Sequence, residues 1–253
     1  MGDLQDLGAE ILEHLKLYRS LGIRLVAKPA PRPTPARVAE QPTTGIQIPG
    51  TRSLFTPQTA GIEDLHAIRA DLGDCRRCKL APLRKHIVFG AGNPNADLMF
   101  VGEAPGADED EQGLPFVGRA GQMLTRIIQA IQMRREDVYI CNILKCRPPG
   151  NRSPEGDEIT ACQGFLFRQV AAVRPRVICA LGGYAAQALL GTKEPISRLR
   201  GHFIDFHGAM LMATFHPSYL LRNPAEKRKV WEDVQKIRDY LRPSPDGEVR
   251  ETS

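Results

Sequence analysis

From residue 62 onward, short apolar runs alternate with longer amphipathic ones. The runs typical of buried strands are 98–101, 138–144, 177–181 and 211–215. Apolar residues recur at helical spacing in 122–131, 155–173, 184–190 and 225–241. This alternation predicts an α/β fold with three layers, in which helices cover both faces of a doubly wound, mostly parallel sheet. His207-Gly208, between two β-like runs, predicts one hairpin late in the chain.

The first 60 residues follow a different pattern. Apolar residues at helical spacing predict one amphipathic helix within residues 1–25: Leu4, Leu7, Ile11, Leu15 and Tyr18. Residues 26–60 are rich in proline and poor in large apolar residues, which is typical of an extended linker. We expect the main domain at 61–242 and a frayed tail at 243–253. The helix could dock on a partner protein or pack on its own domain, and its pattern favours neither.

Composition narrows the class of protein. A hydrophobic content of 42% with 25% charged residues is ordinary for a soluble globular protein. No apolar run approaches the ~20 residues of a membrane helix, and no basic segment opens a signal peptide. We therefore expect a cytoplasmic protein without membrane contact, and a monomer. The net charge of +5 and the pI near 9.0 are compatible with nucleic acid as a partner but do not establish it.

The six cysteines of a chain without an export signal are expected to be reduced thiols. Cys141 and Cys179 lie within strand patterns and are assigned to the core. Cys75 and Cys78 form a CxxC pair, and Cys146 and Cys162 flank a loop that begins with proline and glycine. One close pair and one separated pair suit a four-ligand metal site, in which the donors could hold zinc or iron; incidental burial is the alternative.

Three polar segments each follow an apolar strand pattern. They are Gly102 to Gly106, Asn142, and His216-Pro217-Ser218. If the strands are parallel, all three segments meet at the carboxyl edge of one sheet, where such folds bind ligands. Each has a structural alternative, because Gly-Pro-Gly can be a tight turn and His216 can be a hydrogen-bonded core residue. The first segment lacks the GK[ST] ending of a phosphate-binding loop, which excludes that class of nucleotide hydrolase.

Read together, these segments resemble the family 4 uracil-DNA glycosylases. The resemblance rests on Gly102-Glu-Ala-Pro-Gly-Ala-Asp-Glu109, Pro115-Phe-Val-Gly-Arg-Ala-Gly121, Asn142-Ile-Leu-Lys-Cys-Arg-Pro-Pro149 and His216-Pro-Ser218, with the four cysteines interleaved. It covers roughly residues 74–241. It implies an enzyme that flips uracil out of DNA and hydrolyses its glycosidic bond, leaving an abasic site for base excision repair. It also implies a structural 4Fe–4S cluster on Cys75, Cys78, Cys146 and Cys162.

The resemblance further implies roles for individual residues. Phe116 would stack on the flipped ring, Asn142 would pair with O4 and N3–H of uracil, and His216 would hydrogen-bond O2, where negative charge develops. The remaining pocket residues implied are Gly102, Glu103, Ala104, Gly106, Asp108 and Glu109. Of these, Glu109 is expected beside C5, where it would exclude the methyl group of thymine. Ala104 stands where other members of the superfamily have a water-activating Asp, which leaves Glu103 as the candidate base.

Basic and apolar residues outside the pocket are candidates for DNA contact. Lys145, Arg147, Arg152, Arg198 and Arg200 lie in loops that could face phosphates. Leu220, Leu221 and Arg222 could fill the gap left by the flipped base, or the leucines could begin the core stripe of the last helix.

Two other functions share part of this pattern. A non-catalytic iron–sulfur or zinc protein that senses DNA damage would need the cysteines and basic loops, but not Phe116, Asn142 and His216 together. A glycosylase that traps its substrate through a histidine would need a basic insert, and the loop 195–201 before His202 has none.

Overall fold

The computed structural model describes residues 63–242. The predicted N-terminal helix, the proline-rich linker and the tail at 243–253 lie outside these residues, so those predictions stay predictions. No helix between residues 63 and 242 is long and apolar enough to cross a membrane.

Residues 63–242 contain a six-stranded sheet with the order β1-β3-β2-β4-β6-β5. Its strands are β1 (Ala91–Gly92), β2 (Leu98–Gly102), β3 (Tyr139–Asn142), β4 (Val177–Leu181), β5 (Phe203–Phe206) and β6 (Ala209–Thr214). The four central strands β3, β2, β4 and β6 are parallel, and the edge strands β1 and β5 are antiparallel to their neighbours. The predicted mostly parallel sheet is therefore confirmed.

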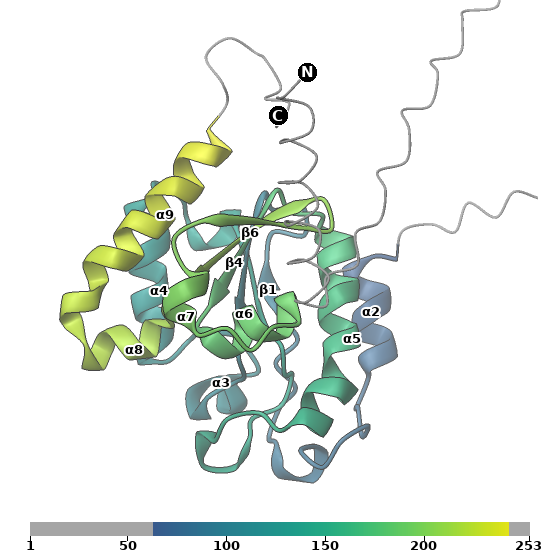
Figure 1. Cartoon of the computed structure of the whole chain (residues 1–253). Coiled ribbons are helices and arrows are strands. Elements are labelled where there is room, and N and C mark those ends of the chain that lie inside the picture. The colour runs from purple at the N-terminus through teal and green to yellow at the C-terminus, as the bar shows by residue number, and fades with distance from the viewer. Residues whose placement is uncertain (1–62, 243–253) are drawn as a thin grey trace, which may run out of the picture. The chain divides into compact units, whose positions relative to one another are not determined.

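Helices cover both faces of the sheet (Figure 1). They are α2 (Leu65–Leu72), α3 (Ala107–Gln112), α4 (Arg119–Ala130), α5 (Gly156–Val173), α6 (Gly183–Leu190), α7 (Ile196–Leu199), α8 (Pro217–Arg222) and α9 (Lys227–Leu241). Strand β2 shows why two cores form: Leu98 and Phe100 pack with apolar residues of α4 and α9, while Met99 and Val101 pack with those of α5 and α6. Alternate side chains of a strand point to opposite faces, so each face carries its own core.

The late hairpin is also confirmed. Strands β5 and β6 pair as an antiparallel ribbon through His207-Gly208, whose φ angles are 52° and 87°. Two successive positive φ angles are the geometry of the tight turn that matches strand twist. Four short helices were not predicted: α2, α3, α7 and α8. In α3 the acidic residues Asp108, Glu109 and Asp110 occupy the first turn, where the helix dipole favours negative charge.

A buried ion pair ties helix α9 to the end of β6. The guanidinium group of Arg200 donates to both carboxylate oxygens of Asp233 at 2.6 and 3.2 Å, and the Thr214 hydroxyl donates to the same carboxylate at 2.6 Å. Burial raises the pKa of Asp233, which the Thr214 and Arg200 hydrogen bonds oppose. The Arg200 side chain is only 17% exposed and its guanidinium group is occupied, which disfavours the predicted contact with DNA. Thr214 lies two residues before His216, so this pair supports the candidate site.

Replacing Arg200 with alanine should lower the free energy of unfolding by about 3–5 kcal/mol, because it leaves the buried Asp233 carboxylate without its partner. The matched control is Arg198→Ala, which removes only an exposed pair with Glu194 and should change stability by less than about 1 kcal/mol. Urea denaturation measures the free energy of unfolding of both variants. Equal losses would contradict the structural role of Arg200.

Candidate active site

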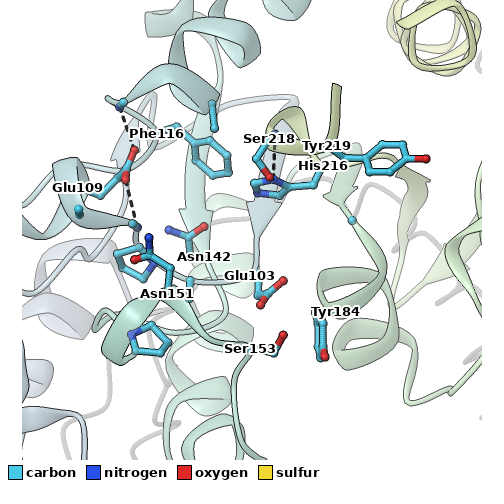
Figure 2. A pocket seen from close by; sticks show the side chains of 18 of the residues that line it. Glu103, Glu109, Phe116, Asn142, Asn151, Ser153, Tyr184, His216, Ser218 and Tyr219 are labelled. Carbon is cyan, nitrogen blue, oxygen red and sulfur yellow. Dashed lines mark hydrogen bonds between the residues drawn. The ribbon is translucent and has the colours of Figure 1, made fainter. Parts of the chain in front are cut away.

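The carboxyl ends of the parallel strands open into one cavity of about 740 Å³. Its walls include Glu103, directly after β2, and Asn142, the last residue of β3. Gly182 follows β4 and His216 follows β6, and both also line it. Figure 2 shows Glu103, Asn142 and His216 around the same space. The predicted convergence of the three polar segments at this sheet edge is confirmed.

Asn142 brings an unpaired acceptor into the cavity. Its side chain is 1% exposed, and Oδ1 has no hydrogen-bond partner. A buried polar atom left unpaired costs about 1–3 kcal/mol, so such an atom in a cavity wall indicates a ligand that pairs with it. Only glycine fits beside it at position 102, since a Cβ there would lie 2.3 Å from Asn142 Oδ1 and 2.6 Å from Phe116 Cζ.

Phe116 places an aromatic ring over this amide (Figure 2). Its ring lies 5.7 Å from the His216 ring between centroids, at an interplanar angle of 36°. The backbone of Phe116 has a φ of 53°, unusual for a residue with a side chain, so the surrounding loop must hold it there. Gly121 allows this loop to pack closely, because a Cβ there would lie 1.8 Å from the Phe116 carbonyl oxygen. The ring is both a core residue and a cavity wall.

Glu109 braces the loop that carries Phe116. Its carboxylate accepts hydrogen bonds from the backbone N–H groups of Val117 (2.9 Å), Gly118 (3.0 Å) and Gly106 (3.1 Å). The side chain is buried and lines the cavity, as do Ala104, Gly106 and Asp108. Its contacts thus join the segment 102–109 to the segment 115–121. The expected position of Glu109 beside C5 of a base stays a prediction.

His216 presents a neutral imidazole. Its Nδ1 accepts the backbone N–H of Ser218 at 3.2 Å and lies 2.7 Å from Ser218 Oγ. Because Nδ1 is an acceptor, the ring proton of the neutral form resides on Nε2. Burial, and then the nearby positive charge of Arg222, lower the pKa of His216 to about 4. At neutral pH the ring is therefore an uncharged N–H donor.

Glu103 supplies a carboxyl group to the same cavity (Figure 2). Burial raises its pKa above the ordinary value for glutamate. A raised pKa brings a carboxylate closer to the range in which it can accept a proton efficiently near neutral pH.

Two helix N-termini give the cavity a positive bias. Gly118 and Arg119 at the start of α4, and Gly182 and Gly183 at the start of α6, line it. The free N–H groups at such ends favour nearby negative charge. Arg119 and Arg222 are exposed on the same cavity wall and add formal positive charge.

Several lining residues were not predicted from the sequence, notably Arg119, Tyr184 and Tyr219. The signal for Tyr184 was available: Gly182-Gly183-Tyr184 follows a strand pattern just as the three recognised segments do.

Two further predicted DNA contacts, Lys145 and Arg152, have side-chain partners within the protein. Lys145 is 1% exposed and cannot reach a phosphate, because its Nζ donates inside the protein to Asn142 O and Gln169 Oε1. Arg152 lines the cavity, but its guanidinium group is held by the fully buried carboxylate of Glu158 at 2.5 and 2.9 Å. Arg152 therefore braces the loop before α5, and its contact with DNA stays a prediction.

The remaining candidates for DNA contact have mixed surroundings. Leu220 is buried in the core and Leu221 is partly buried against it, but both lie on α8 and not on the last helix α9. Arg147 is half-buried and donates to Asn151 at 2.8 Å, while Arg222 is exposed. Contacts of Arg147, Leu221 and Arg222 with DNA stay predictions.

Two of the cysteines lie in the core, as predicted. Cys141 and Cys179 are fully buried strand residues. Cys146 and Cys162 are buried in one core cluster, against which Cys78 packs. Burial raises the pKa of the Cys146 thiol, and charge on Cys162 or Cys78 would raise it further, so these thiols are within electrostatic range of each other.

N–H groups point at the sulfur atoms of three of the four candidate ligands. Arg77 Nη1 points to Cys75 Sγ at 3.8 Å, Arg84 Nη1 to Cys146 Sγ at 3.6 Å, and the backbone N–H of Lys145 to Cys162 Sγ at 3.3 Å. Between residues 63 and 242, no three His, Cys, Asp or Glu side chains lie close enough together to hold a single metal ion.

Comparisons with known proteins agree with this geometry. The pattern of the Uracil DNA glycosylase superfamily matches residues 89–235. The Type-4 uracil-DNA glycosylase of Thermotoga maritima is 46% identical over 172 residues, 66% of this chain and 90% of the relative. That of Saccharolobus solfataricus is 41% identical, covering 73% of this chain and 89% of the relative. That of Archaeoglobus fulgidus is also 41% identical, covering 70% and 92%.

Glu109→Gln should lower the free energy of unfolding by about 1–3 kcal/mol, because the amide turns one acceptor into a donor that faces a backbone N–H. Hydrogen exchange at the amides of Val117 and Gly118 should accelerate. Glu111→Gln is the control, since Glu111 makes only an exposed pair with Lys85. Unchanged exchange at both amides in a folded Glu109→Gln variant would contradict the bracing role.

Proposed function

Since this chain belongs to the uracil-DNA glycosylase superfamily, and within it to the type-4 uracil-DNA glycosylases, we propose that it flips uracil out of DNA and hydrolyses the bond between the base and deoxyribose. The abasic site that remains is the starting point of base excision repair. The observation that carries this proposal is the buried, unpaired Oδ1 of Asn142 in the wall of the cavity that Phe116 and the neutral His216 also line. A damage sensor without catalysis has no need of that combination.

Recognition of uracil would depend on Asn142 and Phe116. The flipped ring would stack on Phe116 and direct its edge at the amide. Uracil N3–H would donate to the unpaired Oδ1, and Nδ2 would donate to O4. Cytosine presents an acceptor at N3 and a donor at N4, so the same amide meets it with the wrong polarity at both points.

His216 would stabilise the leaving group. As the bond between C1′ and N1 breaks, its electron pair moves into the uracil ring and negative charge develops on O2. The Nε2–H of the neutral imidazole would donate to O2, and the N-termini of α4 and α6 favour negative charge in the cavity. A neutral donor suits this role, because it stabilises the charge without protonating the base.

Glu103 would act on the nucleophile. Water adds to C1′ of the oxocarbenium-like sugar, and one of its protons passes to the Glu103 carboxylate. The products are the uracil anion, protonated afterwards from solvent, and an abasic deoxyribose.

Cys75, Cys78, Cys146 and Cys162 would hold a 4Fe–4S cluster. The residues fit such a group by donor type and by the N–H groups that point at three of the four sulfurs, which is how proteins support these clusters. The cluster would supply cross-linking between the segment before β1, the loop after β3, and α5.

The outer contacts complete the proposal. Arg119, Arg147 and Arg222 would contact phosphates around the flipped nucleotide, and Leu221 would enter the gap it leaves. We also keep as proposals that the enzyme is a cytoplasmic monomer and that the N-terminal helix binds a protein partner.

Asn142→Asp should lose most excision of uracil, on the order of 10–100-fold in single-turnover rate, and gain weak excision of cytosine from mismatched sites. An ionised carboxylate offers only acceptors, and a protonated one can match N3 and N4 of cytosine. Oligonucleotides containing uracil or cytosine are incubated with each variant, and alkali cleaves the abasic product.

Asn151→Asp is the matched control, because Asn151 lines the same cavity and gains the same charge. It should retain excision within about threefold of the parent rate, as expected away from the recognition contacts. If folded Asn142→Asp excises uracil at the parent rate, Asn142 does not recognise the base.

The pH profile of the single-turnover rate should separate Glu103 from His216. Burial raises the pKa of Glu103, so its basic form is lost as the pH falls through a value above that of an exposed glutamate. His216 has a pKa of about 4 and stays neutral over the same range. We expect an acid limb in the parent that Glu103→Gln abolishes, whereas His216→Ala lowers the rate roughly 10²–10³-fold and keeps the limb. An acid limb that remains in Glu103→Gln excludes Glu103 as the base.

A further inference from the structure

Lys145 is a buried cation without a negatively charged partner. Its side chain is 1% exposed, and both hydrogen-bond partners of Nζ are neutral oxygens: Asn142 O at 2.7 Å and Gln169 Oε1 at 2.5 Å. Removing an ammonium group from water without an opposite charge is strongly unfavourable. A negative charge nearby would offset this cost.

The two other cations beside the cysteines do not share this problem. Arg77 pairs with Asp71 at 3.1 Å, and Arg84 pairs with Asp74 at 2.6 Å. Between residues 63 and 242, three basic residues donate a hydrogen bond to a cysteine sulfur: Arg77 and Arg84 through their side chains, and Lys145 through its backbone N–H. Of these three, only Lys145 has no carboxylate partner.

The four candidate ligand cysteines are a possible source of that charge, because two of them adjoin Lys145. Lys145 precedes Cys146 in the chain, and its backbone N–H donates to Cys162 Sγ at 3.3 Å. It thus contacts one candidate ligand and is covalently joined to another. Four thiolates around an iron–sulfide core leave a net negative charge, and nearby cations and N–H groups tune such a group.

The same side chain reaches the residue that recognises uracil. The two backbone N–H groups after Asn142 donate to the β2 end, Ile143 to Gly102 at 2.9 Å and Leu144 to Glu103 at 3.1 Å. The Asn142 carbonyl itself is held by Lys145 Nζ. The backbone of Asn142 is therefore held by hydrogen bonds to the end of β2 and by the hydrogen bond from the Lys145 ammonium group.

We propose that Lys145 is the buried counter-charge of the group bound by the four cysteines and a positioning residue that couples this group to the Asn142 amide. The proposal rests on the function proposed above. Loss of the negative group leaves the ammonium uncompensated and frees the Asn142 carbonyl. The metal site then controls base recognition although it does not touch the base.

The test compares Lys145→Met, which keeps the length but removes charge and donor, with Gln169→Met. Gln169 is the other acceptor of Lys145 Nζ and also donates to Tyr139 Oη and Phe89 O, so its variant perturbs the same buried network and keeps the charge. The parent, purified without oxygen, should contain iron and give an electron paramagnetic resonance signal after reduction. A redox titration of that signal, iron loss to a chelator, and DNA assays are run on all three proteins.

Lys145→Met should shift the reduction potential to more negative values, because a nearby cation stabilises the reduced form, and should lose iron faster. Its single-turnover excision of uracil should fall roughly 10-fold, as for one lost hydrogen bond in the recognition step. Affinity for DNA with an abasic site, which offers no base to Asn142, should stay within about twofold. Gln169→Met should keep the parent potential.

An unchanged potential in folded Lys145→Met overturns the proposal, as does an equal shift in Gln169→Met. If Lys145→Met does not fold by circular dichroism, Lys145→Gln removes the same charge and retains an N–H donor. It should then show the same shift of potential, and an unshifted potential overturns the proposal equally. A parent that lacks iron or does not excise uracil contradicts the proposed function instead, so the two failures are distinguishable.

Discussion

The whole site depends on the pairing of Gly102 with Asn142 at the ends of β2 and β3. In the parallel register these residues are direct partners, so the first polar segment and the amide lie side by side. The missing side chain at Gly102 leaves room for Asn142 Oδ1 and for the Phe116 ring, which a Cβ would strike at 2.3 and 2.6 Å. A shift of register by one residue would turn every side chain of β3 to the other face and separate all three groups.

Buried charge then holds the loops around this pair. Glu109 accepts three backbone N–H groups, Glu158 holds Arg152, and Asp233 holds Arg200 below the end of β6. A carboxylate that accepts several hydrogen bonds fixes irregular backbone more tightly than apolar packing can, because each bond has a direction. The loops can therefore keep a strained residue such as Phe116 in place without a regular element beneath it.

The sequence predicted what depends on local periodicity and on motifs. The central strands, the hairpin, and the meeting of Asn142 and His216 at one sheet edge follow from alternation and from parallel connectivity. Lys145 and Arg200 escaped prediction for one reason. Each looks like an exposed basic residue in a loop, and each is buried by a partner far along the chain, Gln169 and Asp233. No window of local sequence contains such a pairing. The helices α3 and α8 were missed because six residues show too little periodicity.

Burial acts on Glu103 and His216, two of the titratable groups of the cavity, in a consistent direction. It lowers the pKa of His216 and raises that of Glu103, so both shift toward their uncharged forms. For His216 this fixes a neutral N–H donor, and for Glu103 it strengthens a base. The N-termini of α4 and α6 keep their partial positive charge, because backbone N–H groups do not ionise in this pH range. Charge that develops on a bound base therefore meets fixed dipoles and one neutral donor. Such an environment stabilises an anion without having to reorganise, which is the condition under which electrostatics contributes most to catalysis.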